Sequence, residues 1–184
     1  MAAASLNDEP MHLADCCPAV SRPLLLTIID HLPPCPALVL SVGSGSGLFE
    51  AMLVEMAGKH RARDLDLRGV EVPLCVNKYL PPDRLLRVPS TVSLHPDAFL
   101  ASAWMFVYPR QADLVAKYLD SYIDGAVETL VWLGQRSDWP EVERILLDAF
   151  DKMECIDGPG IPEYEVLVVA TMPRIIRKPR VPSD

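Results

Sequence analysis

The stretch Leu38-Val-Leu-Ser-Val-Gly-Ser-Gly-Ser-Gly-Leu-Phe-Glu50 decides the fold. Its first part, within residues 37–42, is almost wholly apolar, which predicts a strand buried on both faces of a parallel sheet. Its last part opens a run over residues 48–59 in which apolar side chains recur at helical spacing. Three glycines separate the two elements: Gly43, Gly45 and Gly47. A strand, a glycine-rich loop and a helix in this order predict a ligand-binding crevice at the carboxyl edge of an open α/β sheet.

Strands and helices alternate along the rest of the chain. The patterns predict helices over 18–32, 48–59, 111–123 and 137–150, with short helical segments at 76–80 and 95–101. They predict strands over 37–42, 66–72, 85–88, 103–108, 128–133, 151–156 and 165–171. We therefore expect an α/β fold: a doubly wound, mostly parallel seven-stranded sheet with a C-terminal antiparallel hairpin and helices on both faces.

The glycine spacing separates three kinds of ligand-binding loop. The dinucleotide fingerprint has glycines at its first, third and sixth positions, and the sixth position here is Leu48. A phosphate-binding P-loop has a lysine after its last glycine, and no lysine follows Gly47. Glycines at the first, third and fifth positions resemble the first motif of class I (Rossmann-like) S-adenosylmethionine-dependent methyltransferases. In that family the loop passes the methionine part of the cofactor.

The resemblance implies S-adenosylmethionine as the cofactor and assigns part of its binding site to the loop. The loop residues concerned are Ser41, Gly43, Ser44, Gly45 and Gly47. A further candidate is Glu71, near the end of the predicted strand 66–72, whose carboxylate can accept two hydrogen bonds from a ribose diol. The resemblance implies that role for Glu71. The competing interpretation is an exposed acid at a strand end.

A third region of resemblance is Trp104-Met-Phe-Val-Tyr-Pro-Arg110. A strand that ends in an aromatic residue and proline looks like the fourth motif of the family, where the loop after the strand faces the transferable methyl group. With the strand at 130–134 and the closing segment 159–169, this region resembles a small, poorly characterised branch of the family. The resemblance extends over residues 36–172.

Three residues are candidates for the wall that faces the methyl group: His95, Tyr108 and Arg110. Tyr108 is also a candidate cofactor contact. Each has a structural alternative, because His95 precedes a predicted helix, Tyr108 can be a packing aromatic and Arg110 a surface cation. Methyl transfer from a sulfonium is an in-line displacement in which the protein chiefly positions the two reactants. A general base helps only where the acceptor must lose a proton.

The sequence departs from the family pattern in three places. Ser41 stands where many members carry an acid before the glycines, so a hydroxyl replaces the acid at that cofactor contact. No acid follows the predicted strand 85–88 to bind the adenine amino group, so Ser90 or a backbone carbonyl would have to take that role. The connection from the second to the fourth predicted strand is short and rich in proline, so we expect its helices to be reduced.

Length and composition fit one domain. The chain has 184 residues, and we expect a single domain over 18–173, a flexible segment over 1–17 and a basic, proline-rich tail over 174–184. There are 17 basic and 25 acidic residues, so the net charge of −8 argues against a general nucleic-acid binder. The 18 prolines exclude a coiled coil or long-helix bundle as the main architecture.

Targeting and metal signals are missing from the pattern. The first residues lack the basic and apolar regions of a signal peptide, and no apolar run approaches the length of a membrane span, so we expect a cytoplasmic protein without membrane association. The five cysteines include an adjacent pair, Cys16-Cys17, but they have no metal-ligand spacing, and we expect no metal site.

Two functional hypotheses follow. The first is an S-adenosylmethionine-dependent methyltransferase acting on a small-molecule acceptor. The alternative is a catalytically silent methyltransferase-like protein that serves as an interaction or accessory module, or as a scaffold for a different reaction. In both cases the short chain leaves little to enclose a substrate, so a second copy or a protein partner is expected to cover the site.

Overall fold

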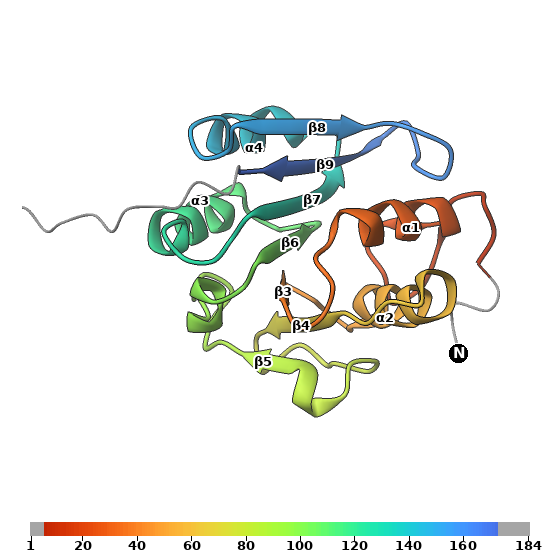
Figure 1. Cartoon of the computed structure of the whole chain (residues 1–184), viewed down its shortest axis with the longest axis horizontal. Coiled ribbons are helices and arrows are strands. Elements are labelled where there is room, and N and C mark those ends of the chain that lie inside the picture. The colour runs from red at the N-terminus through yellow and green to blue at the C-terminus, as the bar shows by residue number, and fades with distance from the viewer. Residues whose placement is uncertain (1–5, 173–184) are drawn as a thin grey trace, which may run out of the picture.

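A seven-stranded sheet runs through the centre of the computed structural model, which describes residues 6–172 (Figure 1). Its strands are β3 (Leu38–Val42), β4 (Asp66–Glu71), β5 (Leu85–Arg87), β6 (Ala103–Val107), β7 (Thr129–Gln135), β8 (Lys152–Ile156) and β9 (Glu165–Thr171). They lie in the order β5-β4-β3-β6-β7-β9-β8. Strands β5, β4, β3, β6 and β7 pair in parallel, whereas β9 is antiparallel to both β7 and β8. The predicted doubly wound sheet with a closing antiparallel hairpin is confirmed.

Helices cover both faces of this sheet, as expected (Figure 1). Helices α1 (Arg22–His31) and α2 (Leu48–Arg61) lie on one face, and α3 (Ala112–Tyr122) and α4 (Trp139–Leu147) lie on the other. Two short 3₁₀ helices are η2 (Pro82–Arg84) and η3 (Pro96–Phe99), and a small antiparallel ribbon is made of β1 (Met11–His12) and β2 (Ala19–Val20). Because β4 is linked to β6 only through η2, β5 and η3, the helices of this connection are reduced, as the prolines predict.

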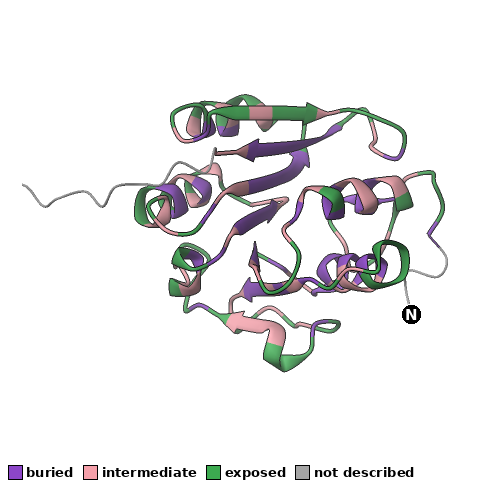
Figure 2. Ribbon diagram, in the orientation of Figure 1, coloured by how far each residue is buried: buried purple, intermediate pink, exposed green. Residues whose placement is uncertain are grey.

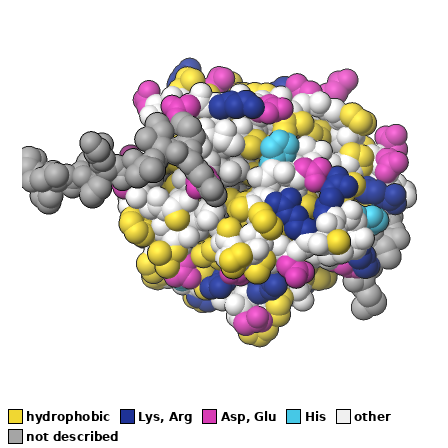
Figure 3. Space-filling view, viewed as in Figure 1, with side chains coloured by type: hydrophobic (Ala, Val, Ile, Leu, Met, Phe, Trp, Pro, Cys, Tyr) yellow, Lys and Arg dark blue, Asp and Glu magenta, His cyan; other side chains and the backbone are white. Residues whose placement is uncertain are grey.

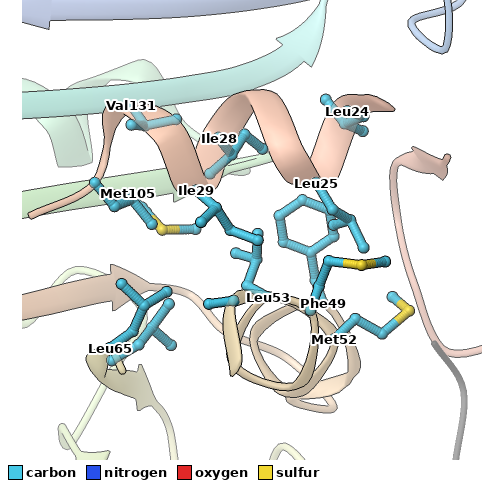
Figure 4. Close-up of a cluster of buried hydrophobic side chains, with 14 of the residues drawn as sticks. Leu24, Leu25, Ile28, Ile29, Phe49, Met52, Leu53, Leu65, Met105 and Val131 are labelled. Atoms are coloured by element: carbon cyan, nitrogen blue, oxygen red, sulfur yellow. The ribbon is translucent and has the colours of Figure 1, made fainter. Parts of the chain in front are cut away.

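The core has two parts, one on each face of the sheet, and Figure 2 shows the central strands buried between them, while the edge strands β5 and β8 are more exposed. Successive strand residues point to opposite faces, so Val39 packs with the α1–α2 side and Leu40 with the α3–α4 side. Figure 4 shows the first part, in which apolar side chains of α1 and α2 point toward one another, with Met105 and Val131 of the sheet beside them. This packing fixes α2, and therefore the loop that precedes it, against the end of β3.

The largest differences between the predicted elements and the structure lie in three segments. The helix predicted over 18–32 begins only at Arg22, because Ser21 is its N-cap and the Ser21 hydroxyl accepts a 3.1 Å hydrogen bond from the Leu24 N–H. The helical turn predicted over 76–80 is wrong. There the Asn77 side chain accepts from the Leu80 N–H at 3.1 Å and donates to the Leu80 carbonyl at 2.6 Å, so a side-chain turn replaces the helix. The segment predicted over 95–101 is the 3₁₀ helix η3.

The N-terminal residues that the structure describes pack on the domain. Leu6 is buried in the α1–α2 part of the core, and its carbonyl accepts a 3.0 Å hydrogen bond from the Arg22 guanidinium. Packing therefore continues on the N-terminal side of the boundary expected at residue 18. The basic tail predicted over 174–184 lies outside the described residues. Within residues 6–172, no helix combines the length and the apolar character that crossing a membrane requires.

Candidate functional site

The glycine loop begins at the carboxyl end of β3. On one side of β3 the chain continues to β4 and β5, and on the other side to β6 and β7, so the strand order reverses here. Its first two amides, those of Gly43 and Ser44, donate to the Val70 carbonyl of β4 at 2.9 and 3.2 Å. Its three glycines all have positive φ, of 79° at Gly43, 57° at Gly45 and 82° at Gly47. Residues with side chains rarely adopt this conformation, so the glycines are required by the path of the backbone.

The three glycines have different surroundings. A Cβ at Gly43 or Gly45 would meet nothing within 4 Å, so space is open beside both residues. A Cβ at Gly47 would lie 2.6 Å from Asn77 Oδ1 and 3.0 Å from the Leu80 backbone nitrogen. The turn over 77–80 therefore closes over Gly47, while Gly43 and Gly45 leave room for a ligand to approach the backbone.

Glu71 stands beside the loop, at the carboxyl end of β4. Its Oε2 accepts a 2.7 Å hydrogen bond from the Gly45 N–H, and its Oε1 accepts a 2.8 Å bond from the Val72 N–H. The structure thus brings together Glu71 and the glycines, as the motif positions predict. Each carboxylate oxygen has a second lone pair, so the group retains capacity to accept from a diol.

Ser41 and Glu50 form a buried pair beneath the loop. The Ser41 hydroxyl donates to Glu50 Oε1 at 2.6 Å, and only 2% of Glu50 is exposed. Glu50 Oε2 has no hydrogen-bond partner among the residues that the structure describes. Burial raises the pKa of Glu50 to about 7, against the hydrogen bond from Ser41, which lowers it. The sequence analysis assigned no role to Glu50, because neither its position in the motif nor its helical spacing distinguishes it.

A small cavity of about 70 Å³ lies between the loop and the N-terminal segment. The lining residues are Asp15, Cys16, Cys17, Pro18, Gly43, Ser44, Gly45, Ser46, Phe49, Glu50 and Val107. Residues 15–18 form one wall of the cavity, and we call them the strap. Burial raises the pKa of the Cys16 thiol, and the Glu50 carboxylate adds to that increase.

Asp15 holds the strap in place through both its backbone and its side chain. Its carbonyl accepts a 2.7 Å hydrogen bond from the Ser46 hydroxyl. Its carboxylate accepts from Lys78 Nζ at 2.6 Å and from the Tyr79 hydroxyl at 2.9 Å, and these bonds lower the pKa of Asp15. The strap is thus tied to the glycine loop and to the turn that closes over it. No pattern in the sequence linked Asp15 to residues more than 30 positions away.

Tyr108 lies one residue beyond the cavity-lining Val107, with a positive φ of 51°. A non-glycine residue in this region is strained by roughly 1–3 kcal/mol, and such strain concentrates at functional sites. The Tyr108 hydroxyl donates to Glu165 Oε1 at 2.6 Å, and the same oxygen accepts from the Ala19 N–H at 3.0 Å. Burial and the Glu165 carboxylate raise the pKa of Tyr108 well above its usual range. In this structure the phenol therefore contacts the start of β9 and not the glycine loop.

The remaining predicted site residues are more dispersed. Arg110 is exposed after β6. Ser90 is exposed after β5, at the same edge of the sheet as the glycine loop, and its hydroxyl lies 2.8 Å from that of Ser93. His95 is the N-cap of η3, where its Nδ1 accepts from the Asp97 N–H at 3.2 Å and its backbone N–H donates to the Tyr118 hydroxyl at 3.4 Å. Its position on the segment leading to the amino end of β6 gives no support to the predicted catalytic role.

The residues around the cavity fit S-adenosylmethionine in chemical type. Space is open beside Gly43 and Gly45, and two buried acceptors, Ser44 Oγ and Glu50 Oε2, lack a partner among the described residues. Carboxylates surround the loop, which suits a ligand with cationic groups and a diol. Among residues 6–172 no group of three or more His, Cys, Asp and Glu side chains is arranged to hold a metal ion.

Comparisons with known proteins identify the fold. No protein-family model matches the sequence, and no curated protein matches it. Among solved structures, the S-adenosylmethionine-dependent methyltransferase SibL in its apo form matches 84% of this chain at 16% identity, with a TM-score of 0.56. Precorrin-6y C5,15-methyltransferase from Geobacter metallireducens GS-15 matches 82% at 11% identity, covering 87% of that protein, with a TM-score of 0.53. A dimethyladenosine transferase from Plasmodium falciparum matches 81% at 15% identity, covering 60% of that protein, with a TM-score of 0.53.

These likenesses agree with the resemblance in the glycine loop: the chain has the Rossmann-like fold of S-adenosylmethionine-dependent methyltransferases. The chain spans 55% of the length of SibL. The fold does not determine the methyl acceptor, because one of these proteins is named for precorrin-6y and another for dimethyladenosine.

Proposed function

We propose that this protein is an S-adenosylmethionine-dependent methyltransferase that acts on a small-molecule acceptor. The observation that carries the proposal is the pairing of an open glycine loop with an acid on the neighbouring strand. Gly43 and Gly45 leave space beside the backbone, and Glu71 presents its carboxylate next to them through the 2.7 Å bond from Gly45. This arrangement lies at the topological switch point of the sheet, where open α/β folds bind their ligands.

Each of these residues has a role in the proposed complex. The backbone at Gly43 and Gly45 would border the methionine part of the cofactor, with Ser44 Oγ as an additional acceptor. Glu71 would accept hydrogen bonds from the two ribose hydroxyls. Ser90, at the exposed end of β5, would contact the adenine. When bound, the cofactor supplies the methyl group as part of a sulfonium.

The transfer itself requires mainly that acceptor and methyl group be held in line. Tyr108 and Arg110 follow the cavity-lining end of β6, and we propose that they contribute to the wall that the acceptor meets. Because the pKa of Tyr108 is raised, its hydroxyl remains protonated at neutral pH and acts as a hydrogen-bond donor. We therefore propose an acceptor whose methylation does not require a deprotonated tyrosine as the general base.

The surface charge supports a small acceptor over a nucleic acid. Figure 3 shows Lys and Arg side chains gathered over α1 and α2, mixed with acidic and histidine side chains. Arg61, at the end of α2, is committed to Asp30 by two bonds of 2.7 and 2.8 Å. At the cavity itself, the lining side chains include the acids Asp15 and Glu50 and no Lys or Arg, and Glu71 stands beside the loop, which does not favour a phosphate backbone.

Calorimetry with S-adenosylhomocysteine, the product of the transfer, tests the proposal. Wild-type protein should bind it, and Glu71→Ala should weaken binding about 10- to 100-fold, because two hydrogen bonds to a charged acceptor are lost. Glu154→Ala, which removes an exposed strand acid of β8 far along the sheet, is the control and should leave the dissociation constant unchanged. Absence of binding by the wild type at roughly millimolar ligand would exclude a cofactor role for the loop.

One observation favours the second candidate, a catalytically silent module that binds another protein or a second copy of itself. The cavity is about 70 Å³, while small-molecule pockets usually measure roughly 300–1,000 Å³. The strap would have to move for the cavity to take the whole cofactor. If size-exclusion chromatography shows a stable oligomer or complex whose loop binds no cofactor, this candidate replaces the enzyme.

A further inference from the structure

Glu50 is a buried acid in the wall of the cavity. It lies on the first turn of α2, with 2% of its surface exposed, and its Oε2 finds no hydrogen-bond partner within the described part of the chain. An unpaired buried carboxylate oxygen destabilises a fold unless another group satisfies it. No cation of the described residues forms an ion pair with Glu50, so no described side chain neutralises its charged form.

The position of Glu50 indicates where such a partner would enter. Glu50 lines the small cavity together with Gly43, Gly45 and Ser44, so a ligand group in the cavity lies next to the carboxylate and to the loop. Ser44 Oγ is a second buried oxygen without a partner in the described region. The cavity offers acceptors and no side-chain cation among its lining residues, and Glu71 adds negative charge beside the loop at Gly45. A compact cationic donor is the group that complements it.

Resting on the proposed function, we infer that Glu50 is the specificity residue for the cofactor's amino-acid end, and that its Oε2 receives the ammonium group of the methionine moiety. An ammonium carries three donors and no acceptor, which matches the two unpaired oxygens of Glu50 and Ser44. The sulfonium has no hydrogen to donate, so it cannot satisfy these oxygens.

Ser41 acts on this contact through Glu50. Its hydroxyl holds Oε1 at 2.6 Å, which orients the carboxylate and leaves Oε2 as the free oxygen. Ser41 thus places a hydroxyl at the strand position before the glycines, and the carboxylate is supplied by Glu50 of the following helix, α2. Ser41 is a positioning residue in this arrangement, and the departure from the family pattern at Ser41 is compensated nine residues later.

The test compares two ligands on two proteins. Binding of S-adenosylhomocysteine and of its deamino analogue, which keeps the carboxylate but lacks the ammonium, is measured by calorimetry for the wild type and for Glu50→Gln. The wild type should prefer S-adenosylhomocysteine by about 10- to 100-fold, since the contact is a charge-assisted hydrogen bond in a buried site. Glu50→Gln should lose most of that preference, by at least about tenfold, while it binds the deamino analogue as the wild type does.

The outcomes distinguish a failure of the Glu50 assignment from a failure of the proposed function. If the wild type binds S-adenosylhomocysteine and its analogue equally, or if Glu50→Gln weakens both ligands by the same factor, the assignment of Glu50 is wrong and the cofactor site stands. If the wild type binds neither ligand, the proposed function fails and this inference fails with it.

Folding is controlled separately. Glu55→Gln makes the same change on α2 at a residue paired with Lys59 at the surface, and it should leave both dissociation constants unchanged. Glu50→Gln should also melt at the same temperature as the wild type or above it at neutral pH, because a buried charge is removed. A lower melting temperature together with an unchanged ligand preference would show that Glu50 serves only the fold.

Discussion

Gly45 and Glu71 are joined by a 2.7 Å hydrogen bond from the glycine N–H to the carboxylate, although 26 positions separate them in the sequence. The bond connects the ends of two neighbouring parallel strands, β3 and β4, whose register pairs Val42 with Val70. It fixes the conformation of the loop at the residue where space for a ligand is open. The acid therefore shapes the loop in addition to presenting a carboxylate beside it.

Gly47→Ala should destabilise the protein more than Gly45→Ala. Both alanines would adopt a positive φ, which costs roughly 1–2 kcal/mol. At Gly47 the new Cβ would also meet Asn77 Oδ1 at 2.6 Å and the Leu80 nitrogen at 3.0 Å, adding an overpacking penalty of about 1–3 kcal/mol. Urea denaturation of both variants checks this order. Equal losses of unfolding free energy in the two variants would show that the turn over 77–80 moves away from the new Cβ at no energetic cost.

The buried carboxyl of Glu50 should make stability fall as pH rises. Its pKa is raised from 4.5 to about 7 in the folded state, so its contribution is fully present below about pH 4.5 and is lost through pH 7. Between pH 5 and pH 8 this amounts to roughly 2–3 kcal/mol of unfolding free energy. The neighbouring Glu71 carboxylate also raises the pKa of Glu50, whereas the Cys16 thiol, whose own pKa is raised by burial, stays protonated in this window.

Unfolding free energies of the wild type and of Glu50→Gln, measured at pH 5 and pH 8, test this dependence. Other groups contribute equally to the pH dependence of both proteins, so the informative quantity is the difference between the two pH changes. The variant should lack the part due to Glu50. An identical pH change in both proteins would mean that Glu50 is not the titrating group.

Asp15→Asn should loosen the strap with little effect on global stability. The exposed contacts of the Asp15 carboxylate with Lys78 and Tyr79 are of the kind that adds little to stability. The strap, however, has few other anchors, so its local opening should increase. Hydrogen exchange of the amides over residues 13–20 should become faster in the variant. The control is Asp8→Asn, a change at an acid outside the strap in a 3.9 Å ion pair with Arg22. Equal exchange in both variants would show that the Asp15 carboxylate does not hold the strap in place.

The fold could be predicted because its signals are local. The apolar strand, the glycines and the helix in residues 38–50 identify the centre of the sheet, and alternation of strands and helices supplies the rest. The proximity of Glu71 to the loop could also be predicted, since the carboxyl ends of adjacent parallel strands meet at one edge.

The remainder of the site depends on contacts that no local pattern encodes. Asp15 reaches Lys78 across 63 positions, and a small acid in an N-terminal segment gives no sign of its partner. The turn at Asn77 looked helical because apolar residues flank it, but the asparagine side chain competes for the backbone. The residue type of His95 makes it a candidate from the sequence. Its position in the fold, however, depends on the path of the chain from β5 to η3, which no local pattern predicts.

Gly69 on β4 is a further requirement of the loop, and Gly69→Ala should be strongly unfavourable. Its Cβ would collide with Ser44 Oγ and would lie 2.7 Å from both Ser44 Cβ and Leu80 Cδ1. Because β4 is held by hydrogen bonds to its neighbouring strands, the loop would have to shift instead. We expect this shift to lower the unfolding free energy by about 1–3 kcal/mol. Because Ser44 borders the cavity, S-adenosylhomocysteine binding should weaken in the same variant.

The matched control is Gly58→Ala in α2, where a Cβ meets nothing within 4 Å and the backbone is helical. That change should stabilise the protein by about 0.5–1 kcal/mol, since alanine favours the helix more than glycine does. Chemical denaturation of the two variants therefore gives changes of opposite sign for one substitution type. If Gly69→Ala is as stable as the wild type and binds the ligand equally well, the loop does not require the absence of a side chain at Gly69.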